Sequence, residues 1–153
     1  RRYATAAIGR IGASAEPKVP DLLALRRREP LLASAIDNAL VEIGSSEAVA
    51  SLLVSLPDHP MYVLRDIKSL GKNGYDAGPA VLDYLQDPDW DVRVIAADTL
   101  GRIGYGSASS TLARTLTDED DWKLVYAASI SLGRLNADEF IDELESVRST
   151  HWY

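Results

Sequence analysis

The chain has 153 residues, of which 46% are apolar and 25% are charged, and its formal net charge is -7 at pH 7. This length suits a single domain with a substantial core, and the acidic balance argues against a general DNA- or RNA-coating protein, which needs a basic surface. The sequence has no cysteine, which excludes disulfides and thiolate sites, and no apolar run approaches the ~18 residues of a membrane-spanning helix.

A short string of residues recurs five times along the chain. It reads IGRIG at residues 8–12, LVEIG at 40–44, LGKNG at 70–74, LGRIG at 100–104 and LGRLN at 132–136, so its last residues are spaced by 32, 30, 30 and 32. Such a period is typical of helical solenoids, in which each repeat contacts its neighbours. We predict one domain over residues 1–153, with repeats at approximately 1–12 (partial), 13–44, 45–74, 75–104 and 105–136, and a terminal helix at 138–149.

Each string ends a predicted helix. In the best copy, Val92, Ala96, Leu100 and Ile103 follow helical spacing and form one apolar stripe, and Leu124, Ala128, Leu132 and Leu135 repeat it. The final residues of the strings, Gly12, Gly44, Gly74, Gly104 and Asn136, suit the left-handed conformation that follows many helices. Asp89 and Asp121 are natural N-caps. Shorter apolar segments at 19–27, 47–56, 78–86, 109–116 and 139–147 predict a second helix in each repeat.

A glycine occupies the same position inside four of the five strings. In a helix interior, glycine costs roughly 1 kcal/mol relative to alanine. We expect this cost to be offset by a close approach of adjacent helices, where a side chain would clash. The residues concerned are Gly9, Gly71, Gly101 and Gly133.

Residues 85–104, LQDPDWDVRVIAADTLGRIG, resemble a HEAT repeat of the short kind first noted in phycobilisome bilin lyases. The resemblance implies an all-α fold, an α-solenoid with a right-handed superhelix of about five helical hairpins and about ten helices. It also implies that the helix containing Val92 and Arg93 lines the inner surface. Because Arg1 aligns with Arg93 inside this helix, and the chain does not begin with Met, we expect an incomplete or processed chain.

The residues do not predict catalysis, a metal or a cofactor. Alternating Asp87, Asp89 and Asp91 suggest a calcium loop, but Val92 and Asp98 stand where such a loop needs its bending Gly and clamping Glu. Some HEAT-repeat hydroxylases bind iron through His-Glu pairs, whereas His59 and His151 have no neighbouring Glu. Nucleophile, P-loop and dinucleotide motifs are absent.

The inner-helix face, opposite the buried stripe, is the candidate binding surface. Its basic row, Arg10, Glu42, Lys72, Arg102 and Arg134, is basic at four of five positions, which predicts either a grip for acidic segments or simply cations at helix C-termini. Trp90 and Trp122 begin successive inner helices and, with Tyr126, are candidate contacts. The predicted partner-binding residues are Met61, Arg65, Lys68, Lys72, Trp90, Ile95, Asp98, Arg102, Trp122, Tyr126, Ile130 and Arg134.

These observations favour a cytoplasmic, non-catalytic scaffold that binds a partner protein or acidic peptide through its inner-helix face, without a membrane or nucleic-acid partner. An alternative rests on the resemblance alone, namely a bilin lyase or a related chromophore-handling protein. A third alternative, a designed or evolved toxin-neutralising binder, differs from the first only in its partner.

Overall fold

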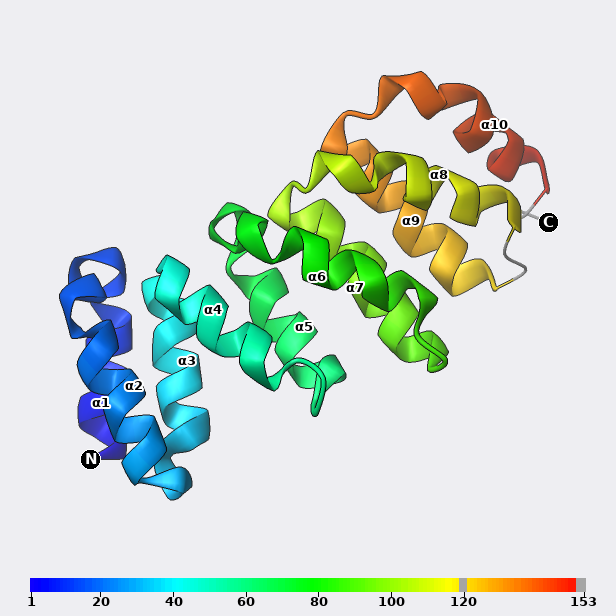
Figure 1. The fold of residues 1–153 in the computed structure, drawn as a ribbon. Coiled ribbons are helices and arrows are strands. Elements are labelled where there is room, and N and C mark those ends of the chain that lie inside the picture. The colour runs from blue at the N-terminus through cyan, green and yellow to red at the C-terminus, as the bar shows by residue number, and fades with distance from the viewer. Residues whose placement is uncertain (119–120, 151–153) are drawn as a thin grey trace. The chain divides into compact units, whose positions relative to one another are not determined.

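The computed structural model describes residues 1–118 and 121–150, with side chains up to residue 148 (Figure 1). The tail residues His151, Trp152 and Tyr153 lie outside the described residues. Within the described ranges every regular element is helical, and this confirms the predicted all-α fold of helical hairpins. The α-helices are α1 (Arg2–Arg10), α2 (Val19–Arg28), α3 (Ala33–Ile43), α4 (Ser46–Ser55), α5 (Pro60–Ser69), α6 (Gly78–Asp83), α7 (Trp90–Ile103), α8 (Ser109–Asp118), α9 (Trp122–Leu135) and α10 (Ile141–Thr150).

Short 3₁₀ helices connect or extend several of these α-helices. They are η1 (Gly12–Lys18), η2 (Pro30–Leu32), η3 (Gly71–Ala77), η4 (Tyr84–Gln86), η5 (Gly106–Ala108) and η6 (Asp138–Phe140). One of them takes the place of α-helix at the start of a predicted inner helix: η2 begins with Pro30, so α3 starts three residues later, at Ala33. Proline at the first position of a helical turn removes only an N–H that would have no partner there.

The repeated apolar stripe forms the core, as predicted. Its residues on α7 and α9 with at most 2% of their surface exposed are Val92, Ala96, Leu100, Ile103, Leu124, Ala128 and Leu132. Burying a valine or leucine side chain of this kind stabilises the fold by about 1.5–3 kcal/mol relative to leaving it exposed. Leu135, the last predicted member of the stripe, is only half-buried because it lies in the final turn of α9.

Capping residues fix both ends of α7 and α9. The side chain of Asp89 accepts a hydrogen bond from the backbone N–H of Asp91 at 2.9 Å, and Asp121 accepts one from Lys123 at 2.8 Å. Gly104 and Asn136 take the left-handed conformation after the last turn, with φ of 77° and 53°. These caps satisfy backbone groups that a bare helix end leaves without partners, and both helices run for 14 residues.

The turn with the alternating aspartates is a hinge between two helices. The carboxylate of Asp87 accepts a hydrogen bond from the backbone N–H of Asp89 at 2.8 Å, a local turn of the kind that aspartate favours. The carboxylates of Asp87 and Asp89 therefore accept hydrogen bonds from backbone N–H groups of their own turn.

The third repeat departs from the predicted pattern. Helix α5 ends at Ser69, and Gly71, with φ of 54°, is the left-handed residue in place of Gly74. The prediction that Gly74 takes this conformation is wrong, because the chain has already left the helix and Gly74 lies buried in η3. Lys72 consequently lies in η3, beyond the end of α5, and not on the predicted inner-helix face.

The glycine positions inside the strings divide into two kinds. A Cβ added to Gly9 would lie 2.7 Å from the Cα of Ala39, and one added to Gly101 would lie 2.6 Å from the Cα of Ser131, so the predicted close approach is confirmed at both. A Cβ added to Gly71 or Gly133 would have no neighbouring atom within 4 Å among the residues that the structure describes. The predicted close approach of another helix is therefore wrong at these two positions. Gly71 owes its glycine to its left-handed backbone instead.

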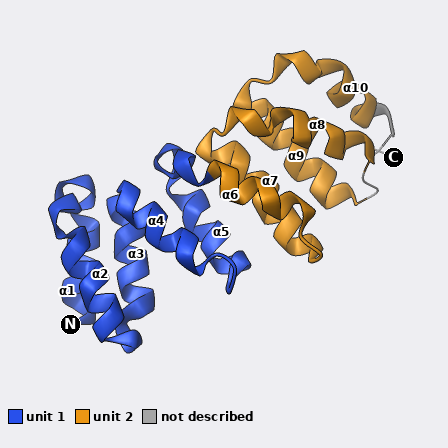
Figure 2. Ribbon diagram, in the orientation of Figure 1, with its two compact units in different colours: residues 1–77 blue, residues 78–153 orange. Residues whose placement is uncertain are grey.

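The chain forms two compact units, which we call unit 1 (residues 1–77) and unit 2 (residues 78–153) (Figure 2). In unit 1, α3 packs against α1, α2, α4 and α5. In unit 2, α7 packs against α6 and α9, and α8 packs against α9 and α10. The single domain and the right-handed superhelix stay predictions for the chain as a whole.

Candidate functional site

All but one of the predicted partner-binding residues lie on three inner helices. Unit 1 holds four of them, of which Met61, Arg65 and Lys68 lie on α5 and Lys72 follows it in η3. Unit 2 holds the other eight: Trp90, Ile95, Asp98 and Arg102 on α7, and Trp122, Tyr126, Ile130 and Arg134 on α9. Because α7 and α9 pack side by side, unit 2 is where predicted residues from different helices come together (Figure 1).

A close helix–helix contact positions these side chains. The small Ser131 of α9 sits directly over Gly101 of α7, and its hydroxyl donates a hydrogen bond to the backbone carbonyl of Ala97 at 2.8 Å. Ser131 is fully buried, so this bond satisfies a polar group that would otherwise destabilise the core. The contact fixes the register of α9 on α7, and therefore fixes which side chains face each other along the two helices.

A groove of about 450 Å³ runs between the two helices on this surface, and we call it the α7–α9 groove. Asp98, Trp122, Tyr126, Ile130 and Arg134, all predicted from the sequence, line it. Val94, Lys123 and Ala127 also line it and are not among the predicted residues. Trp90, Ile95 and Arg102 of the predicted set are not part of its lining, to which α7 contributes Val94 and Asp98 instead.

Exposed apolar side chains form one wall of the groove. Trp122, Tyr126 and Ile130 follow one another at four-residue intervals along α9, and they expose 63%, 52% and 39% of their surface. Residues spaced in this way share one face of a helix. We call these three residues the α9 ridge. Aromatic side chains on an accessible ridge are typical of the residues that dominate binding at protein interfaces.

Charged groups in the groove are matched to each other. Arg134 of α9 forms an ion pair with Asp98 of α7, so its charge is balanced within the unit. The ammonium of Lys123 lies 4.3 Å from the ring centre of Trp90 and 5.9 Å from that of Trp122. Arg102 is exposed, one turn along α7 from Asp98. The two members of the predicted basic row in unit 2 therefore differ, because Arg134 is paired with Asp98 and Arg102 is exposed.

Lys123 lies against the rings of both Trp90 and Trp122, the first residues of α7 and α9. A cation over an aromatic face is attracted by the ring quadrupole, by about 0.5–1 kcal/mol at an exposed site. The sequence signal for Lys123 is its position one residue after Trp122, on the same face as Ala127. That signal becomes informative only once the neighbouring tryptophan of α7 is known to lie beside it.

Unit 1 offers a different, more polar cavity of about 660 Å³. Arg26 donates to the carboxylate of Asp37 at 2.7 and 3.2 Å and to the hydroxyl of Ser55 at 3.1 Å. Asp66, which departs from the apolar pattern of the other repeats, lines the same cavity. Burial raises the pKa of Asp66 above its ordinary value, and the nearby charge of Asp37 raises it further. Arg65, the residue before Asp66 on α5, is exposed.

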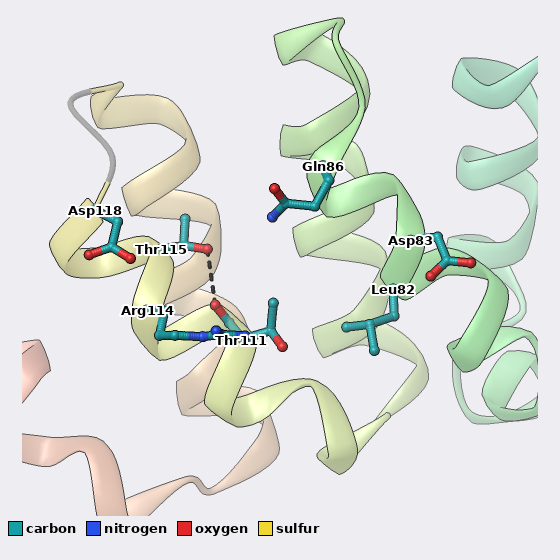
Figure 3. Close-up of a pocket in the computed structure, with 7 residues that line it drawn as sticks. All are labelled: Leu82, Asp83, Gln86, Thr111, Arg114, Thr115 and Asp118. Atoms are coloured by element: carbon teal, nitrogen blue, oxygen red, sulfur yellow. Dashed lines mark hydrogen bonds between the residues drawn. The ribbon is translucent and has the colours of Figure 1, made fainter.

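A third hollow, of about 640 Å³, lies on the outer helices of unit 2 (Figure 3). Leu82 and Gln86 approach it from α6 and η4, and Thr111, Arg114 and Thr115 approach it from α8. The hydroxyl of Thr115 already donates to the backbone carbonyl of Thr111 at 3.1 Å. Although this outer pocket is larger than the α7–α9 groove, it has one aliphatic anchor and no aromatic one, so the groove is the better candidate.

Metal-binding and membrane-spanning features are absent from the described ranges. In residues 1–118 and 121–150, no group of three or more His, Asp or Glu side chains is arranged to hold a metal ion. Across the same residues, no helix combines the length and the hydropathy that crossing a bilayer requires.

A protein-family model described as HEAT repeats matches residues 78–152. The matched stretch coincides with unit 2, which contains the α7–α9 groove. Comparison with curated proteins gives no match.

Proposed function

From the match of residues 78–152 to HEAT repeats, we propose that the chain is a non-catalytic scaffold whose α7–α9 groove binds a segment of a partner protein. HEAT repeats generally serve as protein-interaction scaffolds. The family therefore supports the class of function, and the groove supports the place where binding occurs.

The observation that carries this proposal is the α9 ridge beside matched charges. Trp122, Tyr126 and Ile130 leave apolar surface in contact with water in a unit whose other large apolar residues are mostly buried. Covering such surface stabilises a complex by roughly 25 cal/mol per Å² before the costs of association. A partner segment with two or three apolar side chains at helical or extended spacing would fit along the ridge.

The charges of the groove favour a partner that also carries a carboxylate. Lys123 contributes a cation, and an ammonium held over aromatic rings keeps N–H groups that can donate to an incoming carboxylate. Arg134 and Asp98 balance each other, so Lys123 gives the lining of the groove a net positive charge in an acidic unit. This agrees with the predicted acidic peptide, with Lys123 in place of the basic row as the main contact.

The proposal is tested by removing the ridge while keeping the fold. A triple variant, Trp122→Ala, Tyr126→Ala and Ile130→Ala, should lose at least about tenfold in affinity for a captured partner, because truncating an anchor residue at the centre of an interface typically costs more than 1 kcal/mol. The matched control carries Gln86→Ala, Thr111→Ala and Arg114→Ala in the outer pocket. Affinity capture followed by direct titration of each captured protein gives the comparison.

Equal loss in both triple variants, with far-UV circular dichroism unchanged, would place binding elsewhere. A charge variant separates the apolar part of the proposal from the acidic part. Lys123→Glu should lower the affinity for a partner that carries carboxylates, and should leave the affinity for a purely apolar partner nearly unchanged. Arg134→Glu would be a poorer test, because it would place a second carboxylate beside that of Asp98 and so destabilise the packing of α9 on α7.

The chromophore-handling alternative still rests on the resemblance alone. Its test is whether the purified protein takes up a bilin and gains visible absorbance. No residue of the α7–α9 groove offers a specific reason to expect this.

A further inference from the structure

The polar cavity of unit 1, which we call the unit 1 cavity, is built from four helices. Helices α2, α3, α4 and α5 (Figure 1) all contribute to its lining, and its volume of about 660 Å³ is in the range of small-ligand sites, roughly 300–1,000 Å³. The lining sets one guanidinium against three carboxylates, so its net charge favours a cationic ligand. Its titratable groups are Arg26, Asp37, Asp58, His59, Tyr62 and Asp66.

The repeated pattern does not account for Asp66. At the same position, four residues before the repeated string, the inner helices α3, α7 and α9 carry Ile36, Ala96 and Ala128, and all three are fully buried. Helix α5 instead buries the next residue, Ile67, and leaves Asp66 half-buried in the lining of the cavity. The side chain of Asp66 therefore belongs to the cavity and not to the core.

The carboxylate of Asp66 has no partner in the part of the chain that the structure describes, where no donor bonds to it and no cation pairs with it. Burial raises the pKa of Asp66, and the charge of Asp37 raises it further. Both effects show that the protein leaves the ionised carboxylate poorly compensated. A cation that enters the cavity is therefore attracted more strongly than it would be by a fully hydrated carboxylate.

Arg26 shows how this cavity holds a guanidinium group. Its Nε and Nη2 donate to the carboxylate of Asp37 at 2.7 and 3.2 Å, and its Nη2 also donates to the hydroxyl of Ser55 at 3.1 Å. A planar guanidinium matches a carboxylate through two parallel hydrogen bonds, whereas an ammonium acts as a compact point charge. The charge of Asp37 is thereby balanced within unit 1, and Asp66 is a second carboxylate in the same cavity without such a group.

The rest of the lining suits the other parts of an arginine-like side chain. Tyr62 lies one turn before Asp66 on the same face of α5, and it is 71% exposed. Guanidinium groups stack on accessible aromatic rings of this kind. Leu52 and Val63 add apolar surface to the lining, against which a methylene stem can pack.

These groups fit a guanidinium better than they fit a metal ion. Within residues 1–118 and 121–150, no three His, Asp or Glu side chains are arranged to hold a metal. A guanidinium carries five N–H donors, so a single carboxylate and the hydroxyl groups of the lining can bind it.

We propose that the unit 1 cavity binds a guanidinium-bearing ligand, with Asp66 accepting its N–H groups, Asp58 adding negative charge, and Tyr62 stacking on its plane. The guanidinium belongs either to an arginine side chain of a protein segment or to a small free molecule, and the chemistry of the contact is the same in both cases. This inference goes beyond the proposed function, because none of these residues lines the α7–α9 groove.

Nuclear magnetic resonance titration of the ¹⁵N-labelled chain tests the proposal. The probe is the capped peptide acetyl-Gly-Arg-Gly-amide, and its control replaces arginine with citrulline, which has nearly the same shape but no charge. The arginine peptide should produce saturable shifts at the backbone amides of Asn38, Tyr62 and Asp66, and the citrulline peptide should not. Agmatine, a free guanidinium compound, separates the two sources: the tighter of agmatine and the arginine peptide identifies the source, and either result upholds the guanidinium site.

Variants assign the contact to particular side chains. Asp66→Asn keeps the shape of the side chain and removes its charge, so the affinity for the arginine peptide should fall at least about tenfold. Tyr62→Leu removes the ring and should lower the affinity roughly two- to fivefold. The matched control is Asp76→Asn, which removes the same charge from an exposed position of η3 outside the cavity and should bind like the wild type.

Three results would each overturn the proposal. They are the absence of saturable shifts at the cavity with both guanidinium probes, equal binding of the arginine and citrulline peptides, and equal affinity in Asp66→Asn and Asp76→Asn. Capture of a partner through the α9 ridge should be the same in Asp66→Asn as in the wild type, so failure here would leave the proposed function standing.

Discussion

Units 1 and 2 are built from the same repeat, yet their inner helices differ in length. In unit 2, α7 and α9 each run for 14 residues, whereas in unit 1, α3 runs for 11 and α5 for 10. The longer helices begin at capping aspartates, while α3 and α5 begin after Leu32 and His59, which make no side-chain cap. The apolar stripe therefore sets which face of each helix is buried, and the capping residues set how long each helix is.

The two units also differ in charge. Unit 1 has ten Lys and Arg against nine Asp and Glu, and unit 2 has six against fourteen, so the net negative charge of the chain belongs entirely to unit 2. Unit 2, the acidic unit, also contains the match to HEAT repeats and the α7–α9 groove. All three tryptophans also lie in unit 2, so their fluorescence follows that unit, while far-UV circular dichroism follows both.

The largest effect is expected from filling the helix contact of unit 2. Gly101→Leu would drive a side chain into the backbone of Ser131 and should lower the free energy of unfolding of unit 2 by about 3 kcal/mol, the upper range for overpacking. Urea titration followed by tryptophan fluorescence measures this. Gly133→Leu is the matched control, and an equal loss in both variants would show that the close approach at Gly101 is not the cause.

A smaller change in stability, of opposite sign in the two units, is expected from replacing glycine with alanine at the second residue of the repeated string. Gly71→Ala should destabilise unit 1 by about 1–2 kcal/mol, because its backbone is left-handed. Gly133→Ala should stabilise α9 by roughly 0.5–1 kcal/mol, because alanine favours the helix and has open space there. Thermal unfolding at low protein concentration gives both values, and a gain at Gly71 would contradict the early end of α5.

Removing one cap should cost about 1 kcal/mol. Asp121→Ala deletes the acceptor for the backbone N–H of Lys123 and should shift the fluorescence-detected urea midpoint down. The complementary change is His59→Asn, which offers α5 the cap that it lacks and should raise the stability of unit 1 by a few tenths of a kcal/mol. If Asp121→Ala leaves the midpoint unchanged, caps do not explain the difference in helix length.

The smallest effect concerns pH and Asp66 in unit 1. Its pKa in the folded chain is raised by burial and by Asp37, so the folded state binds the proton more tightly, and stability is lost as pH rises through this range. Asp66→Asn should therefore be more stable than the wild type at pH 7, and the difference should shrink toward pH 3.8. Urea midpoints from circular dichroism measure it, and a less stable Asp66→Asn at pH 7 would contradict the assigned cause.

The sequence predicts most of the fold because periodic information is local. The stripe through Leu100, the cap at Asp89 and the left-handed residue at Gly104 can all be recognised without knowing any neighbour. The early end of α5 cannot, since LGKNG offers both Gly71 and Gly74 and nothing local chooses between them. In the site, each residue of the α9 ridge is among those that the sequence predicts.

What sequence reasoning misses in the site depends on contacts between helices. Arg134 looks like one cation in a row, but Asp98 of the preceding inner helix balances it. Lys123 gains its importance from Trp90, which lies 33 positions earlier in the chain. Gly133 shares its register with Gly101, yet only the structure shows that one holds a helix and the other is open.

Site-directed cross-linking tests the central claim most directly, because a chain without cysteine accepts a single reactive thiol. Ile130→Cys places the thiol on the α9 ridge, and Thr111→Cys places it in the outer pocket. After coupling to a photoreactive group and exposure to native lysate, a partner protein should cross-link at position 130 and not at position 111. A partner that cross-links at 111 and not at 130 would contradict binding through the α7–α9 groove.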